Sequence, residues 1–167
     1  MGDEKNIAAE VLKILETVTD PEVPVLSIID LGIVRKVETA DQQAVKIIIT
    51  PTYTGCPAMD VIRTSIRLAL IEHGITDFEI KTVLSPAWST DWMTDSGKQK
   101  LKVYGIAPPN LKQQVCTPGV FQEEEAIQCP HCNSYNTQLI SRFGSTPCKA
   151  LYKCNECKEP FDYFKCH

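Results

Sequence analysis

Four cysteines near the end of the chain have the spacing of a metal site. Cys129 and Cys132 enclose two residues, and after 21 intervening residues Cys154 and Cys157 repeat the arrangement. A Cys-x-x-Cys turn brings two sulfurs to one ion, and two such turns provide the four sulfurs of a tetrahedral site. The spacing therefore predicts a structural zinc ribbon with these four cysteines as ligands. Tetrahedral thiolate ligation also suits iron, so iron stays open as the alternative ion.

A cysteine far upstream, Cys56, has a different setting. It lies between Gly55 and Pro57, ahead of a helical pattern, and proline is favoured at the first position of a helix, so Cys56 is the expected N-cap. Free backbone N–H groups and the positive end of the helix dipole favour a thiolate there. Cys56 is thus the candidate reactive thiol for metal or cluster transfer. A small buried side chain at a strand-to-helix corner explains it equally well, and no histidine stands nearby in sequence to support a cysteine-protease arrangement.

Three carboxylates and two tryptophans offer weaker signals. Asp20, Glu22 and Asp30 stand in proline-rich corners, where such residues more often cap helices and fix turns than bind metals or catalyse. Trp88 and Trp92 share a polar loop. They either close the core from the side or form a patch for a partner protein, since tryptophan is enriched at binding hot spots.

The remaining candidates have structural explanations. His73 is expected to face solvent at the end of a helix. Cys148 and Cys166 flank the second cysteine pair and could form another thiol site. Because four sulfurs already satisfy a zinc ion, packing around the ribbon is the simpler interpretation.

Composition and charge limit the class of protein. The chain has 167 residues, 43% of them hydrophobic, and a net charge of −4. Residues 1–125 hold 12 Lys/Arg and 18 Asp/Glu, and residues 126–167 hold 5 and 3, so neither part has the basic surface typical of nucleic-acid binders. No signal peptide and no membrane-spanning run is visible, which predicts a cytoplasmic protein whose clustered cysteines serve metal or redox chemistry.

Hydrophobic periodicity places these residues on a small α+β domain. It predicts, in chain order, a helix, two strands, a helix and a strand at residues 7–18, 33–38, 45–50, 57–73 and 78–84. A short helix is expected from about Thr94 to Tyr104. The predicted organisation is an α+β domain over 1–107, a mobile linker over 108–125 that is rich in Gln, Pro and Glu, and a zinc ribbon over 126–167.

Several stretches together resemble a known family. Residues 20–24 (DPEVP), 30–34 (DLGIV) and 52–57 (TYTGCP) resemble the MIP18 (DUF59) domain of iron–sulfur cluster assembly factors. Further stretches resemble the D subunits of bacterial phenylacetyl-CoA epoxidase systems: residues 86–93, 104–109, 143–146, 148–152 and 159–166. The resemblance covers nearly the whole chain except residues 1–6 and the linker.

The resemblance implies a function that composition and spacing do not identify. It implies a non-catalytic accessory or maturation subunit that assists iron or iron–sulfur centre assembly for a ring-epoxidising oxygenase in phenylacetate degradation. The implied partners are the oxygenase and reductase subunits. Binding to nucleic acid or to a membrane is not expected, and a homodimer is left open. It carries over Cys56 as the reactive cysteine of the MIP18 fold and the four ribbon cysteines as the metal-binding set.

Two other functions remain in view. In the first, the chain is an electron-transfer subunit whose four ribbon cysteines hold one redox-active iron. In the second, it is a thiol-redox enzyme acting through Cys56, which the lack of a Cys-x-x-Cys pair in the α+β domain disfavours. Metal content separates the first alternative from a maturation factor.

Overall fold

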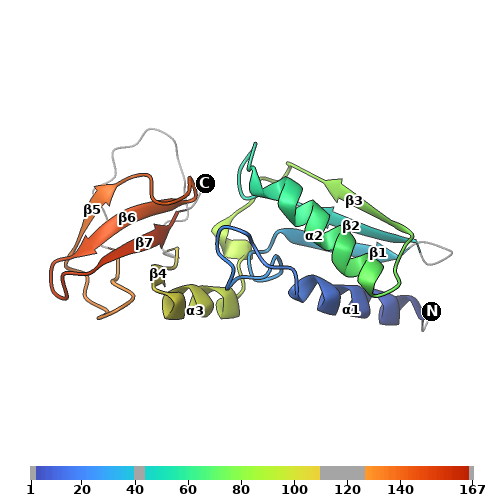
Figure 1. The fold of residues 1–167 in the computed structure, drawn as a ribbon, viewed down its shortest axis with the longest axis horizontal. Coiled ribbons are helices and arrows are strands. Elements are labelled where there is room, and N and C mark those ends of the chain that lie inside the picture. Colours follow the sequence, from blue (N-terminus) through green and yellow to red (C-terminus); the bar gives the residue numbers. More distant parts are fainter. Residues whose placement is uncertain (1–2, 40–43, 110–126, 166–167) are drawn as a thin grey trace. The chain divides into compact units, whose positions relative to one another are not determined.

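The computed structural model describes residues 3–39, 44–109 and 127–165, and it divides into two compact units, residues 1–97 and 98–167 (Figure 1). The predicted linker at 108–125 lies almost entirely outside the described residues, as does Cys166. In the described part of the chain, no helix combines the length and apolar composition needed to cross a membrane.

The first unit contains the five predicted elements in the predicted order. They are α1 (Asp3–Glu16), β1 (Val34–Thr39), β2 (Val45–Ile49), α2 (Ala58–Glu72) and β3 (Phe78–Thr82). The strands form one sheet in the order β1-β2-β3, with β1 antiparallel and β3 parallel to the central β2. The predicted α+β fold is confirmed.

The core of this unit follows from the two periodicities of the sequence. Val45, Ile47 and Ile49 alternate along β2 and are buried, while the residues between them are half-exposed. Ile62 and Ile66 lie on the buried stripe of α2. The neighbouring Arg63 reaches β3, where its Nη2 donates to Thr82 Oγ1 at 2.7 Å, so α2 lies against the sheet next to β3.

The proline-rich corner before β1 is held by its own carboxylates. Asp20 Oδ1 accepts from the backbone N–H groups of Glu22 and Val23, both at 2.8 Å. Asp30 Oδ2 accepts from the Ser27 backbone N–H at 3.1 Å, and Ser27 Oγ accepts from the Asp30 N–H at 3.0 Å. The expected turn-fixing role of Asp20 and Asp30 is confirmed.

The tryptophan loop packs onto this corner. Trp88 is 4% exposed, and its Nε1 donates to the Leu31 carbonyl at 2.9 Å. Thr94 Oγ1 donates to Asp30 Oδ1 at 3.0 Å, which links the loop to the same carboxylate. Trp92 is half-exposed, and the Arg35 guanidinium stacks 3.3 Å from its ring centroid. Trp88 therefore belongs to the core, which agrees with the interpretation that the tryptophan loop closes the core from the side.

The second unit is a four-stranded sheet that includes the ribbon hairpins. After α3 (Asp95–Tyr104), most of which belongs to this unit, come β4 (Ile106–Ala107), β5 (Thr137–Ser141), β6 (Lys149–Cys154) and β7 (Pro160–Phe164). The sheet order is β4-β7-β6-β5, with β4 parallel to β7 and the other neighbours antiparallel. The aromatic residues Phe161, Tyr163 and Phe164 of β7 are all buried in this small module.

The division between the units differs from the predicted boundary at residue 107. Ile106 and Ala107 pair with Asp162 and Tyr163 of β7, and Ala107 is part of the ribbon core. The division falls after Gly97, so most of α3 and all of β4 join the second unit. A strand of two residues has too short a pattern to be recognised in sequence, which explains the different boundary.

Candidate metal centre and candidate reactive thiol

The four ribbon cysteines converge on one point. Cys129, Cys132, Cys154 and Cys157, called the cysteine tetrad below, have sulfurs that all lie within 4.8 Å of one another. The Cys129 and Cys157 sulfurs are 3.7 Å apart, and those of Cys132 and Cys154 are 3.5 Å apart. These distances are far longer than a disulfide bond. A tetrahedral ion with metal–sulfur bonds of ~2.3 Å places its sulfurs roughly 3.8 Å apart, so the tetrad fits such an ion.

Two similar backbone turns position the tetrad. Cys129 and Cys132 precede β5, whereas Cys154 ends β6 and Cys157 follows in the turn toward β7. In each turn the residue after the second cysteine has a left-handed backbone: Asn133 with φ 62° and Lys158 with φ 67°. This conformation usually favours glycine, and because neither position holds one, the turn geometry has little signature in the sequence.

Side chains between the two turns fix their separation. Asn155 Nδ2 donates to Asn136 Oδ1 at 3.1 Å, and the Asn155 backbone N–H donates to the Asn136 carbonyl at 2.8 Å. Asn136 Nδ2 in turn donates to Glu156 Oε1 at 2.8 Å. These supporting residues were missed from the sequence, because asparagines near cysteine turns carry no distinctive spacing. They hold the tetrad close together through contacts outside it.

The electrostatics of the tetrad favour a bound cation. Burial raises the pKa of Cys154, but backbone N–H groups of Cys157 and Glu156 outweigh it and lower that pKa to about 7. A backbone N–H of Glu159 lowers the pKa of Cys157, yet burial and the other tetrad sulfurs outweigh it and raise that pKa to about 12. A thiolate at Cys154 thus makes a second thiolate at Cys157 harder to form. A positive ion at the centre of the tetrad would stabilise all four sulfurs as thiolates.

Cys148 stands apart from the tetrad. It is buried just before β6, so it lies at the opposite end of that strand from Cys154. Its Sγ is 3.0 Å from Thr146 Oγ1, and its carbonyl accepts from the Lys165 backbone N–H at 2.9 Å. These contacts agree with the expected packing role.

Cys56 lies in the first unit, just before α2. The expected assignment as N-cap is wrong by one residue: α2 begins at Ala58, and Pro57 takes the cap position. Pro57 already has helical backbone angles (φ −67°, ψ −24°), and the Met59 N–H donates to the Cys56 carbonyl at 3.2 Å just before the helix. The thiol is half-buried and, among the described residues, forms no disulfide.

His73, at the other end of α2, is exposed as expected, with its Nδ1 2.8 Å from the Ala69 carbonyl.

The sheet places the Cys56 loop at one edge. Because β2 and β3 are parallel, the segments that follow them leave from the same edge of the sheet. The Val83 N–H donates to the Ile49 carbonyl at 2.9 Å, which holds the two strand ends together there. The half-buried Cys56 thiol thus lies in a loop at this edge, one residue before the helix cap.

Comparisons with known proteins define the class of protein. Residues 8–79 match a family model described as iron–sulfur cluster assembly protein, and residues 113–165 match one described as PaaD zinc beta ribbon domain. A crystal structure of a DUF59 domain from Bacillus anthracis has a TM-score of 0.58 and 26% identity, covering 61% of this chain and 97% of its own. The chain thus joins an iron–sulfur-assembly domain to a zinc beta ribbon.

Full-length relatives identify the family. The chain is 47% identical to the D subunit of the "Putative 1,2-phenylacetyl-CoA epoxidase" of Escherichia coli, over 94% of this chain and 92% of that protein. It is also 36% identical to the Fe-S protein maturation auxiliary factor SufT of Staphylococcus aureus, over 52% of this chain and 98% of that protein. The chain belongs to the family of phenylacetyl-CoA epoxidase D subunits.

Proposed function

We propose that this protein is a non-catalytic maturation factor that assists assembly of the iron or iron–sulfur centres of a phenylacetyl-CoA epoxidase. Its partners are the oxygenase and reductase subunits of that system. The observation that carries the proposal is a half-buried thiol on the fold of iron–sulfur assembly proteins, in a chain that matches an epoxidase component over nearly its full length. Three relatives named as Fe-S protein maturation auxiliary factors match 52%, 55% and 60% of the chain.

Cys56 is the residue assigned to handle the cargo. Its thiol loses a proton when it binds iron or a cluster edge, and regains one when a cysteine or carboxylate of the client displaces it. A ligand for transient binding must be reachable, and Cys56 is half-buried, unlike the fully buried Cys129 and Cys154. No general base is needed for ligand exchange of this kind, which agrees with the lack of a histidine nearby in sequence.

The tetrad is assigned a structural zinc ion. Four thiolates complete a tetrahedral shell and leave no open position for substrate or water, as in structural zinc sites. The second unit also has a small core, for which a bound ion supplies folding energy. The same four sulfurs would also hold a redox-active iron. An electron-transfer subunit with iron in the tetrad is therefore the second candidate function.

Metal analysis of anaerobically purified protein separates the two functions. We expect one zinc per chain and no visible absorption from ferric thiolate. After iron–sulfur reconstitution, we expect additional iron that Cys56→Ser protein fails to bind while it keeps its zinc. One iron per chain in the tetrad, with reversible reduction, would support electron transfer and contradict the maturation role.

A further inference from the structure

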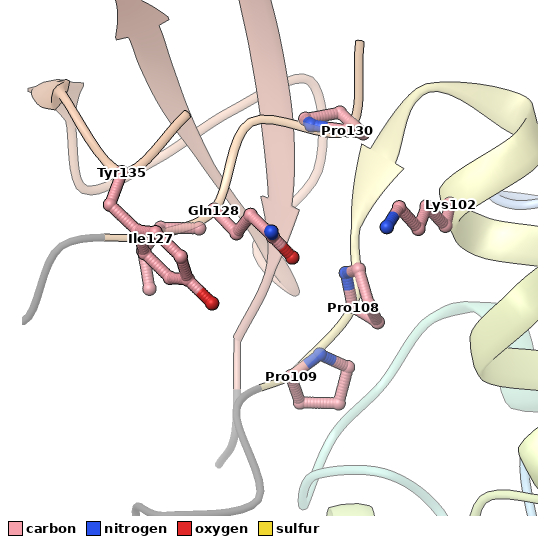
Figure 2. A pocket seen from close by; sticks show the side chains of 7 residues that line it. All are labelled: Lys102, Pro108, Pro109, Ile127, Gln128, Pro130 and Tyr135. Atoms are coloured by element: carbon pink, nitrogen blue, oxygen red, sulfur yellow. The ribbon is translucent and has the colours of Figure 1, made fainter. Parts of the chain in front are cut away.

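The second unit has a small cavity next to the first cysteine turn (Figure 2). Its volume is about 110 Å³, and besides Lys102 its walls are formed by Pro108, Pro109, Ile127, Gln128, Pro130 and Tyr135. Figure 2 shows the Lys102 side chain reaching from α3 toward the prolines of this cavity. The site therefore combines apolar rings with two polar groups, the Gln128 amide and the Lys102 ammonium.

An open depression continues the cavity along α3. The two hollows share Lys102 and Pro130, and the second also includes Val103 and Tyr104. Val103 is 79% exposed, and Tyr104 and Tyr135 are each 59% exposed. We call this continuous surface, made of Lys102, Val103, Tyr104, Pro130 and Tyr135 with the cavity between them, the α3–ribbon face. Three large side chains with apolar surface, Val103, Tyr104 and Tyr135, are thus exposed on this face.

The size of the cavity indicates the kind of occupant. Sites for small organic ligands usually have volumes of about 300–1,000 Å³. The cavity itself is well below that range and has room for about one apolar side chain, whereas the depression beside it, about 420 Å³ in volume, is open to solvent rather than enclosed. Exposed tyrosines around a pocket of this size are typical of protein–protein contacts, in which one anchor residue enters and aromatic neighbours exclude water.

Charge indicates the chemistry of the partner. In the described residues of the second unit, 98–109 and 127–165, there are eight Lys/Arg and three Asp/Glu. Two of these lysines, Lys98 and Lys102, lie four residues apart and therefore on the same side of α3. A divalent ion with four thiolates adds two negative charges at the tetrad, and this part of the unit still remains positive. An acidic partner complements this surface and gains in association rate from it.

We propose that the α3–ribbon face docks an acidic protein segment, one apolar side chain of which enters the cavity beside Lys102. The carboxylates of the segment face Lys98 and Lys102, while Val103, Tyr104 and Tyr135 cover its apolar residues. The proposal goes beyond the maturation role and does not depend on Cys56. It makes the second unit the part of the chain that recognises a partner.

A titration of the full-length, zinc-loaded chain tests the proposal. The probe is a short blocked peptide that alternates glutamate with leucine, and the readout is the backbone amide NMR spectrum. We expect saturable shifts concentrated at residues 102–104, 130 and 135, with affinity falling as salt is added. The matched peptide with lysine in place of glutamate should cause no such shifts.

Two variants and one control sharpen the test. Lys102→Glu and Val103→Ser should each weaken peptide binding, the charge reversal on the order of tenfold. Lys153→Glu makes the same charge change at an exposed position of the same unit outside this face and should bind normally. Unchanged zinc content shows that each variant is folded. Equal binding by Lys102→Glu, shifts spread over other surfaces, preferred binding of duplex DNA, or self-association through this face would each overturn the proposal.

Discussion

Replacing Cys154 with serine should remove the bound metal ion and unfold the second unit, while the first unit keeps its structure. Cys154 is fully buried, and its sulfur is one of four within 4.8 Å of one another. A serine hydroxyl is a poor ligand for zinc at neutral pH. Metal binding at structural thiolate sites contributes about 10 kcal/mol or more to folding, more than the small core of this unit can replace.

The measurement is metal content together with amide hydrogen exchange along the chain. Cys148→Ser is the matched control, because Cys148 is buried in the same unit but lies outside the tetrad. The control should retain one ion and the protection of β5, β6 and β7. If Cys154→Ser protein kept the same protection in these strands, the ion would have no structural role.

Replacing Gly32 with alanine should strongly destabilise the first unit. Gly32 has φ +68°, and an added Cβ would lie 2.3 Å from the Trp92 carbonyl oxygen. The left-handed backbone alone costs about 1–2 kcal/mol for a residue with a side chain. The clash adds about 1–3 kcal/mol, because the neighbouring atoms are mostly backbone and cannot move aside without displacing the tryptophan loop.

Gly74→Ala separates these two contributions. Gly74 has nearly the same backbone, with φ +79°, but no atom of the described residues lies within 4 Å of the added Cβ. Urea unfolding followed by tryptophan fluorescence reports on the first unit, since both tryptophans of the chain lie in it. Gly74→Ala should lose only the backbone contribution. Equal losses in the two variants would show that Gly32 and the tryptophan loop do not pack closely.

The sequence predicted most where a physical pattern extended over many residues. Apolar residues alternate along β2 and recur at helical spacing along α2, and each pattern predicts one buried face. The structure has such a buried face on both elements. The tetrad was predictable because two thiols of one turn must share an ion. Asp20 and Asp30 were also assigned correctly, since short carboxylates beside prolines bond the backbone of their own turn.

Features that depend on distant contacts were not predictable. β4 has only two residues and forms by pairing with the distant strand β7. Because this pairing joins residues 106–107 to the second unit, the predicted boundary at residue 107 differs from the division in the structure. The link from Thr94 to Asp30 joins residues 64 positions apart, and no local pattern announces it. The left-handed backbone at Lys158 was missed because the turn around the metal site, rather than the residue type, imposes it.

The proposed role of Cys56 in assembling the metal centres of partner proteins can be tested directly. The most direct measurement is iron content and turnover of the epoxidase oxygenase and reductase subunits after co-expression with wild-type or Cys56→Ser protein. The substitution exchanges one atom at a half-buried site, so folding and tetrad zinc should be unchanged. We predict iron-deficient, weakly active partners with the variant, whereas partners already matured should turn over without this chain. Fully iron-loaded, fully active partners beside Cys56→Ser protein would contradict this role.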